Sequence, residues 1–96
     1  MKFKELNDEY KILVLIFIST LDNKYVFEKQ IVDLLRHMKL NGHKDIWNKY
    51  KEKFLDLGML ERVYKTKQKQ YVYWISDECY DWVRNVYLHA SELRND

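Results

Sequence analysis

The chain has 96 residues, of which 47% are apolar and 16% aromatic, and its formal net charge is +2. This length predicts one small domain over residues 1–96, with enough apolar content for a core. The start of the chain lacks the layout of a secretion signal, and the apolar run from Ile12 to Ile18 is too short to span a bilayer. The single cysteine, Cys79, excludes an internal disulfide. We therefore expect a cytoplasmic, intracellular protein with no membrane partner.

The charge is unevenly distributed along the chain. Residues 1–35 carry a net −1, residues 36–75 carry +6 and residues 76–96 carry −3. A basic middle between acidic ends predicts one face for a polyanion and another face for a different task. The alternative is chance segregation of charge on a solvated surface.

A first helix is predicted over about residues 8–21, capped by Asn7 or Asp8. Its apolar residues surround the helix axis, so both sides are expected to be buried. One side would face the core, and the other would need a C-terminal helix or a second subunit as cover. A buried strand of the same composition is the competing interpretation.

A second helix is predicted over about residues 27–38, after a turn and a short strand at residues 25–26. Its apolar residues recur at helical spacing, namely Phe27, Ile31, Leu34, Leu35 and Met38.

A third helix is predicted over about residues 44–57. Its inward-facing stripe is formed by Ile46, Trp47, Tyr50, Phe54 and Leu57. Gly58 follows at the position of a left-handed C-cap residue, and Met59 is expected to fold back onto Phe54.

Residues 60–75 predict a β-hairpin, because β-branched and aromatic residues flank a polar tip. A last helix is predicted over about residues 77–93, capped by Ser76 or Asp77. The predicted fold class is mainly α with a small β-hairpin (α+β), in the order helix, short strand, helix, helix, strand, strand, helix.

This order, with LDLGMLERVYKTKQKQYVYWIS at its centre, resembles the winged helix-turn-helix DNA-binding domains over about residues 8–90. The similarity is closest to small dimeric regulators of the PadR and MarR kind, and the composition also looks like that of winged-helix proteins of archaeal viruses and plasmids. The residues that match the pattern are Phe54, Leu57, Gly58, Leu60, Tyr73, Ile75 and Ser76.

The resemblance implies that the third helix enters the major groove of DNA. Lys44, Lys49 and Lys51 suit phosphates, and Asn48 can make a bidentate contact to adenine. Asp45 and Glu52 lie on the same outward face, where they oppose phosphate binding. The alternative is an ordinary helix face of mixed charge.

The hairpin would then be the wing, lying along a neighbouring backbone or minor groove. Arg62 to Ile75 contains four cations and no acid, and phosphate contacts are expected from Lys65, Lys67, Gln68 and Lys69. The alternative is that these lysines only keep the edge of the hairpin from pairing with another chain and so prevent aggregation.

In the resembling families, the first and last helices form a dimer interface. The residues expected there are Ile16, Trp82, Val83, Val86, Tyr87 and Ala90. Isologous pairing of this kind would place two recognition helices on half-sites about one helical turn apart.

No residue pattern points to catalysis, a metal or another cofactor. His37, His43 and His89 lack metal-ligand spacing, and with only Gly42 and Gly58 there is no phosphate-binding glycine loop. Among the hairpin aromatics, core packing is preferred to base stacking.

We expect a non-enzymatic, nucleoid-associated protein that binds double-stranded DNA as a dimeric transcriptional regulator, sequence-specifically or semi-specifically. One alternative is an accessory factor in plasmid partition or chromatin-like organisation. Another is a winged-helix module that contacts proteins and not DNA. A small enzyme or toxin is the last alternative, and the sequence supplies no residues for it.

Overall fold

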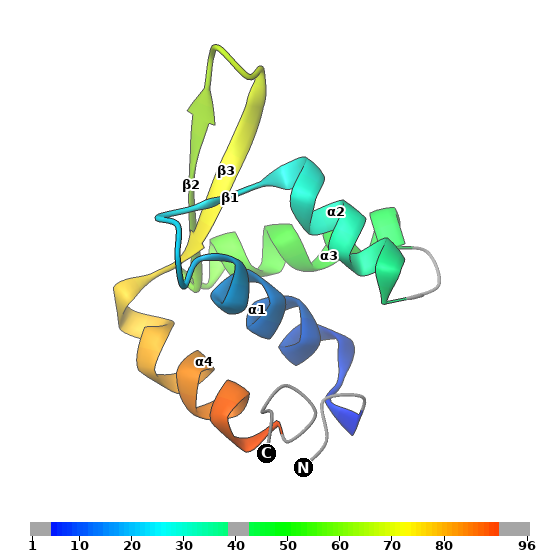
Figure 1. Cartoon of the computed structure of the whole chain (residues 1–96), viewed down its shortest axis with the longest axis vertical. Coiled ribbons are helices and arrows are strands. Elements are labelled where there is room, and N and C mark those ends of the chain that lie inside the picture. The colour runs from blue at the N-terminus through cyan, green and yellow to red at the C-terminus, as the bar shows by residue number, and fades with distance from the viewer. Residues whose placement is uncertain (1–4, 39–42, 91–96) are drawn as a thin grey trace.

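The computed structural model describes residues 5–38 and 43–90, with the backbone alone for residues 43 and 44. Within these ranges the elements are α1 (Asp8–Ser19), β1 (Val26–Phe27), α2 (Glu28–His37), α3 (His43–Asp56), β2 (Leu60–Lys65), β3 (Gln70–Ile75) and α4 (Asp77–His89). The hairpin of β2 and β3 projects from one end of the helices, and α4 packs beside α1 at the other end (Figure 1). The predicted α+β class is confirmed.

The three described strands form one antiparallel sheet with the order β1-β3-β2. β2 and β3 pair along their whole length, from Leu60 opposite Ile75 to Lys65 opposite Gln70. β1 adds only two pairs, with Val26 opposite Tyr73 and Phe27 opposite Val72. The outer half of the hairpin is therefore a two-stranded ribbon that stands clear of β1.

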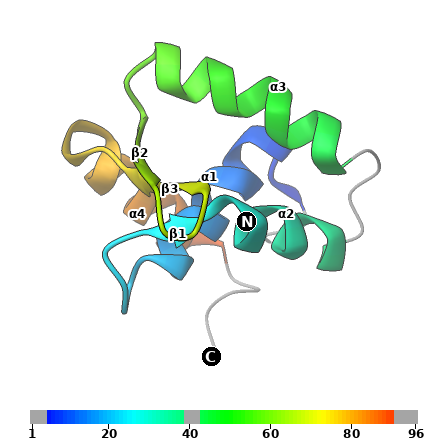
Figure 2. The same ribbon diagram turned by 90° about the horizontal axis from the view of Figure 1, so that it is seen from above.

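The core lies between the helices and one face of the sheet. Side chains alternate along a strand, so Leu60, Tyr73 and Ile75 share the face that packs on the helices. Seen along the hairpin (Figure 2), α3 lies along one side of the molecule and α2 lies beside the sheet. The helices contribute the buried residues Ile12, Leu13, Ile16, Phe17, Ile31, Leu35, Trp47, Phe54 and Val83.

α1 is buried on two sides, as its all-round apolar pattern predicts. One side belongs to the main core, and on the other side Val14 packs with Leu6 and Ala90. The second side of α1 is therefore covered by α4 of the same chain, one of the two covers expected from the sequence. The alternative of a buried strand is wrong.

Two predicted helix caps are confirmed. The Asn7 side chain accepts a hydrogen bond from the backbone N–H of Tyr10 at 3.0 Å. Gly58 has φ of 72°, and the N–H of Met59 donates to the carbonyl of Phe54 at 2.8 Å. Gly58 also donates to Leu55 at 3.1 Å, which completes the two-bond C-terminal motif that needs a left-handed residue.

Several predicted boundaries differ from the structure. α1 ends at Ser19, where the Ser19 and Thr20 hydroxyls bond the carbonyls of the preceding turn. Phe27 belongs to β1 and not to the second helix, and that helix ends at His37. α4 ends at His89, and the predicted residues 91–93 lie outside the described ranges.

Two further expectations need correction. Leu57, predicted to face inward, is 63% exposed. It follows the last residue of α3 and sits about 60° from Phe54 around an ideal helix, at the edge of the buried stripe. Ser76 precedes α4 as predicted, but its buried hydroxyl makes no hydrogen bond within the described residues.

No helix in the described part of the chain has the length and apolar character needed to cross a lipid bilayer.

Candidate nucleic-acid interface

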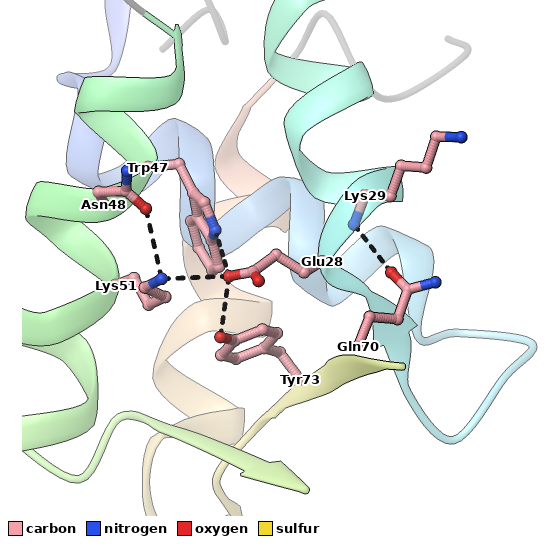
Figure 3. Close-up of polar contacts among 7 residues, drawn as sticks. All are labelled: Glu28, Lys29, Trp47, Asn48, Lys51, Gln70 and Tyr73. Carbon is pink, nitrogen blue, oxygen red and sulfur yellow. Dashed lines mark hydrogen bonds and ion pairs between the residues drawn. The ribbon is translucent and has the colours of Figure 1, made fainter. Parts of the chain in front are cut away.

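A carboxylate at the start of α2 joins three elements. Oε2 of Glu28 accepts hydrogen bonds from Trp47 Nε1 at 2.9 Å, from the Tyr73 hydroxyl at 3.0 Å and from Lys51 Nζ at 3.2 Å (Figure 3). We call these four residues the Glu28 cluster. They tie the first turn of α2 to the middle of α3 and to β3, and so fix the orientation of α3 against the hairpin.

Glu28 remains ionised in this cluster. Burial raises the pKa of its carboxyl, but the hydrogen bonds from Trp47, Lys51 and Tyr73 outweigh that effect, and the pKa is lowered from its ordinary value. Burial and the nearby Glu28 charge raise the pKa of Tyr73, while Arg62 acts in the opposite direction. The tyrosine therefore stays a hydrogen-bond donor.

The first turn of α2 is also held by the end of β3 that lies next to the hairpin tip. The side-chain oxygen of Gln70 on β3 accepts from the backbone N–H of Lys29 at 3.3 Å (Figure 3). Gln30 reaches back to the N–H of Phe27 at 2.9 Å. Both bonds satisfy backbone donors that a helix start leaves unpaired.

Lys51, predicted to meet phosphate, is turned toward the protein. Its side chain is 16% exposed and pairs with Glu28. Its Nζ also donates to Oδ1 of Asn48 at 3.3 Å (Figure 3). The charge of Lys51 is therefore compensated within the chain, and the NH2 group of Asn48 is the part of that amide left for a ligand.

The outward face of α3 carries both signs of charge. Lys49 is exposed, with its Nζ 5.4 Å from the centre of the Tyr50 ring. Asp45 and Glu52 are exposed beside Asn48, as the sequence indicates. The side chain of Lys44 lies outside the described atoms. Along the described part of this face, no excess of positive charge builds up.

The hairpin tip is the more basic surface. Lys67, Gln68 and Lys69 are exposed, and Lys65 is half-buried with its Nζ 4.8 Å from the centre of the Tyr25 ring. None of the salt bridges between described residues involves a lysine of the tip. The tip therefore offers at least two cations that no acid of the described chain neutralises.

Lys69 has an unusual backbone conformation. Its φ is 55°, and it is the single described non-glycine residue with positive φ. A side chain in this left-handed region costs roughly 1–2 kcal/mol, which glycine avoids and asparagine tolerates. Nothing in the sequence marks this position, because lysine is not a usual turn residue here.

Arg62, Tyr64 and Tyr71 were missed as site residues. They continue the helix-facing side of the hairpin beyond the core. The Arg62 guanidinium lies 4.4 Å from the centre of the Tyr71 ring, and the Tyr64 and Tyr71 rings meet edge to face at 5.1 Å. Tyr64 is 49% exposed. Because side chains alternate along a strand, the sequence could have placed Arg62 and Tyr64 on the same face as the buried Leu60.

The predicted dimer surface needs correction. Ile16, Val83 and Ala90 are fully buried within the chain itself, because α1 and α4 pack on each other. They have no area left for a partner. The other three predicted residues keep some exposure: Trp82 is 42% exposed, and Val86 and Tyr87 are half-buried.

The exposed Trp82 borders an apolar groove of about 340 Å³. The groove runs between the end of α3 and the first turns of α4. It is lined by Leu57, Gly58, Met59, Glu78, Cys79 and Trp82. Burial raises the pKa of the Cys79 thiol, which keeps it in the unreactive form.

Comparisons with protein-family models, curated proteins and solved structures find no match to this chain. In residues 5–38 and 43–90, no three His, Cys, Asp or Glu residues come together in a way that could hold a metal ion.

Proposed function

We propose that the chain is a winged helix-turn-helix domain that binds double-stranded DNA as a transcriptional regulator. The observation that carries this proposal is the hairpin tip, where exposed Lys67 and Lys69 project beyond the helices without an acidic partner among the described residues. Clustered cations of this kind gain affinity by releasing counterions from DNA.

The arrangement of elements supports this fold assignment. α2 and α3 are consecutive helices, and the hairpin that follows them lies beside α3 in a sheet with the order β1-β3-β2 (Figure 1). The Glu28 cluster holds α3 against this sheet. Recognition helix and wing would therefore meet DNA as one rigid unit, which reduces the ordering cost on binding.

The conformation of Lys69 gives independent support. Glycine or asparagine would hold the left-handed turn at lower cost, yet the chain places a long cation there. A requirement for positive charge at the tip explains this choice.

The outward face of α3 supports only modest sequence preference. Lys49 and Asn48 are available to DNA, whereas Lys51 is paired with Glu28. Asp45 and Glu52 repel phosphates, so the wing is expected to supply most of the affinity. We therefore infer semi-specific binding.

The same observation favours a second candidate function, an accessory DNA-organising factor. Such a factor needs phosphate contacts more than base contacts, which suits a wing stronger than its recognition helix. The two functions differ in the ratio of specific to non-specific affinity.

Fluorescence anisotropy with a labelled duplex tests the proposal. We expect binding at 50 mM salt that weakens steeply toward 200 mM, because each phosphate contact adds about 0.9 to the slope of log affinity against log salt. Absence of binding at low salt, or a flat slope, would contradict DNA binding. It would favour protein contact through the groove beside Trp82.

A further inference from the structure

Lys51 sets the orientation of the Asn48 amide. An ammonium group has three donors and no acceptor, so the amide atom that faces it must be the oxygen. The Lys51 Nζ to Asn48 Oδ1 distance is 3.3 Å, and a second donor of Lys51 is used on Glu28 at 3.2 Å. The part of the Asn48 amide that points away from Lys51 is therefore its NH2 group (Figure 3), and the residue is exposed.

This orientation is anchored below the surface. Lys51 is held by Glu28, and the same carboxylate oxygen is held by Trp47 and Tyr73. Both of these aromatic residues are almost fully buried. The side chain of Lys51 is therefore constrained by the core, unlike that of a freely rotating surface lysine.

Adenine and guanine differ in what they require of such a group. A bidentate contact to adenine needs one donor, for N7, and one acceptor, for the N6 amino group. Lys51 occupies one of the two lone pairs of the Asn48 oxygen, and its positive charge repels the partly positive amino group of adenine. Guanine offers two acceptors, N7 and O6, and so suits the NH2 group of Asn48 beside the positive charge of Lys51.

We propose that Glu28, Lys51 and Asn48 form a relay that makes α3 select guanine over adenine in the major groove. Asn48 would contact the base, and Lys51 and Glu28 would be positioning residues. The inference rests on the proposed DNA-binding function, and it replaces the adenine contact predicted from the sequence.

Selection from a duplex pool with a randomised 12-base-pair core tests the relay. We expect guanine to be enriched at one or more positions of the bound fraction. Replacing that guanine by 7-deazaguanine, which keeps base pairing but lacks the N7 acceptor, should weaken wild-type binding about tenfold. Asn48→Ala should bind both duplexes equally.

Two variants separate positioning from simple structural support. Glu28→Gln should release Lys51 to phosphate, which steepens the salt slope by about 0.9 while the discrimination between guanine and 7-deazaguanine falls. Lys51→Met removes the charge and the hydrogen bond that orient Asn48, but it leaves the bonds of Glu28 to Trp47 and Tyr73. It should shift the selected base from guanine toward adenine.

Enrichment of adenine by the wild type, or an unchanged guanine preference in Lys51→Met, would overturn the relay while leaving DNA binding intact. Failure of the pool to bind at low salt would overturn the proposed function itself, and the relay with it.

Discussion

Lys69 combines an unfavourable backbone conformation with the chemistry proposed for the wing. Its left-handed φ and its exposed ammonium group lie at the tip of the hairpin. This strain at a surface turn, where glycine or asparagine would be less strained, supports the proposed phosphate contact of Lys69.

Replacing this lysine should therefore separate stability from binding. Lys69→Asn is expected to raise the free energy of unfolding by about 0.5–1 kcal/mol, because asparagine tolerates a left-handed backbone. The same change should weaken duplex binding and lower the salt slope by about 0.9. Urea denaturation and anisotropy measure the two effects.

Lys67→Asn is the matched control, since Lys67 has no positive φ. It should weaken binding to a similar degree without stabilising the fold. Equal stability changes in the two variants would show that backbone strain at Lys69 is not the cause.

At the level of elements, one ionised carboxylate adds to the core packing that holds α3 in position. Glu28 connects α2, α3 and β3 through a single oxygen atom. Because its pKa is lowered in the folded protein, the charged form stabilises the native state.

Acid should therefore weaken the attachment of α3. The contribution of Glu28 is fully present above the ordinary glutamate pKa of about 4.3, and it is lost as the pH falls through the lower value of the folded state. Urea denaturation of the wild type and Glu28→Gln should show a stability difference at pH 7 that shrinks toward pH 3. A difference that stays constant over this range would mean that Glu28 does not titrate in the unfolding equilibrium.

Local sequence patterns predicted the elements well but not the Glu28 cluster. The stripe around Trp47 and Phe54 and the Gly58 cap depend on residues a few positions apart, which a helical repeat and one glycine reveal. The cluster joins Glu28 to residues 19, 23 and 45 positions away. Such pairings become visible only when the packing of α2, α3 and β3 is known.

The whole molecule separates a basic end from an end where two helices pair. The basic middle of the sequence is less available to DNA than its net charge of +6 indicates, because three of its cations are paired within the chain: Arg36 with Asp33, Lys51 with Glu28 and Lys53 with Glu9. Within the described part of this basic middle, the remaining positive charge is therefore concentrated at the hairpin and at Lys49.

The opposite end of the molecule has consequences for dimerisation. α4 uses its apolar face to cover α1, so a dimer would have to form on what remains exposed, chiefly Trp82, Leu57 and Leu88. The interface predicted from the sequence assumed that α1 and α4 had surplus apolar surface. Packing between these helices within one chain buries most of that apolar surface.

The wing is the central claim, and the salt slope of duplex binding tests it most directly. The double variant Lys67→Gln/Lys69→Gln should lower the slope by about 1.8, since two phosphate contacts are lost. The control Lys11→Gln/Arg84→Gln removes the same charge from α1 and α4 and should leave the slope unchanged. Equal losses in both variants, or no change in either, would contradict phosphate binding by the wing.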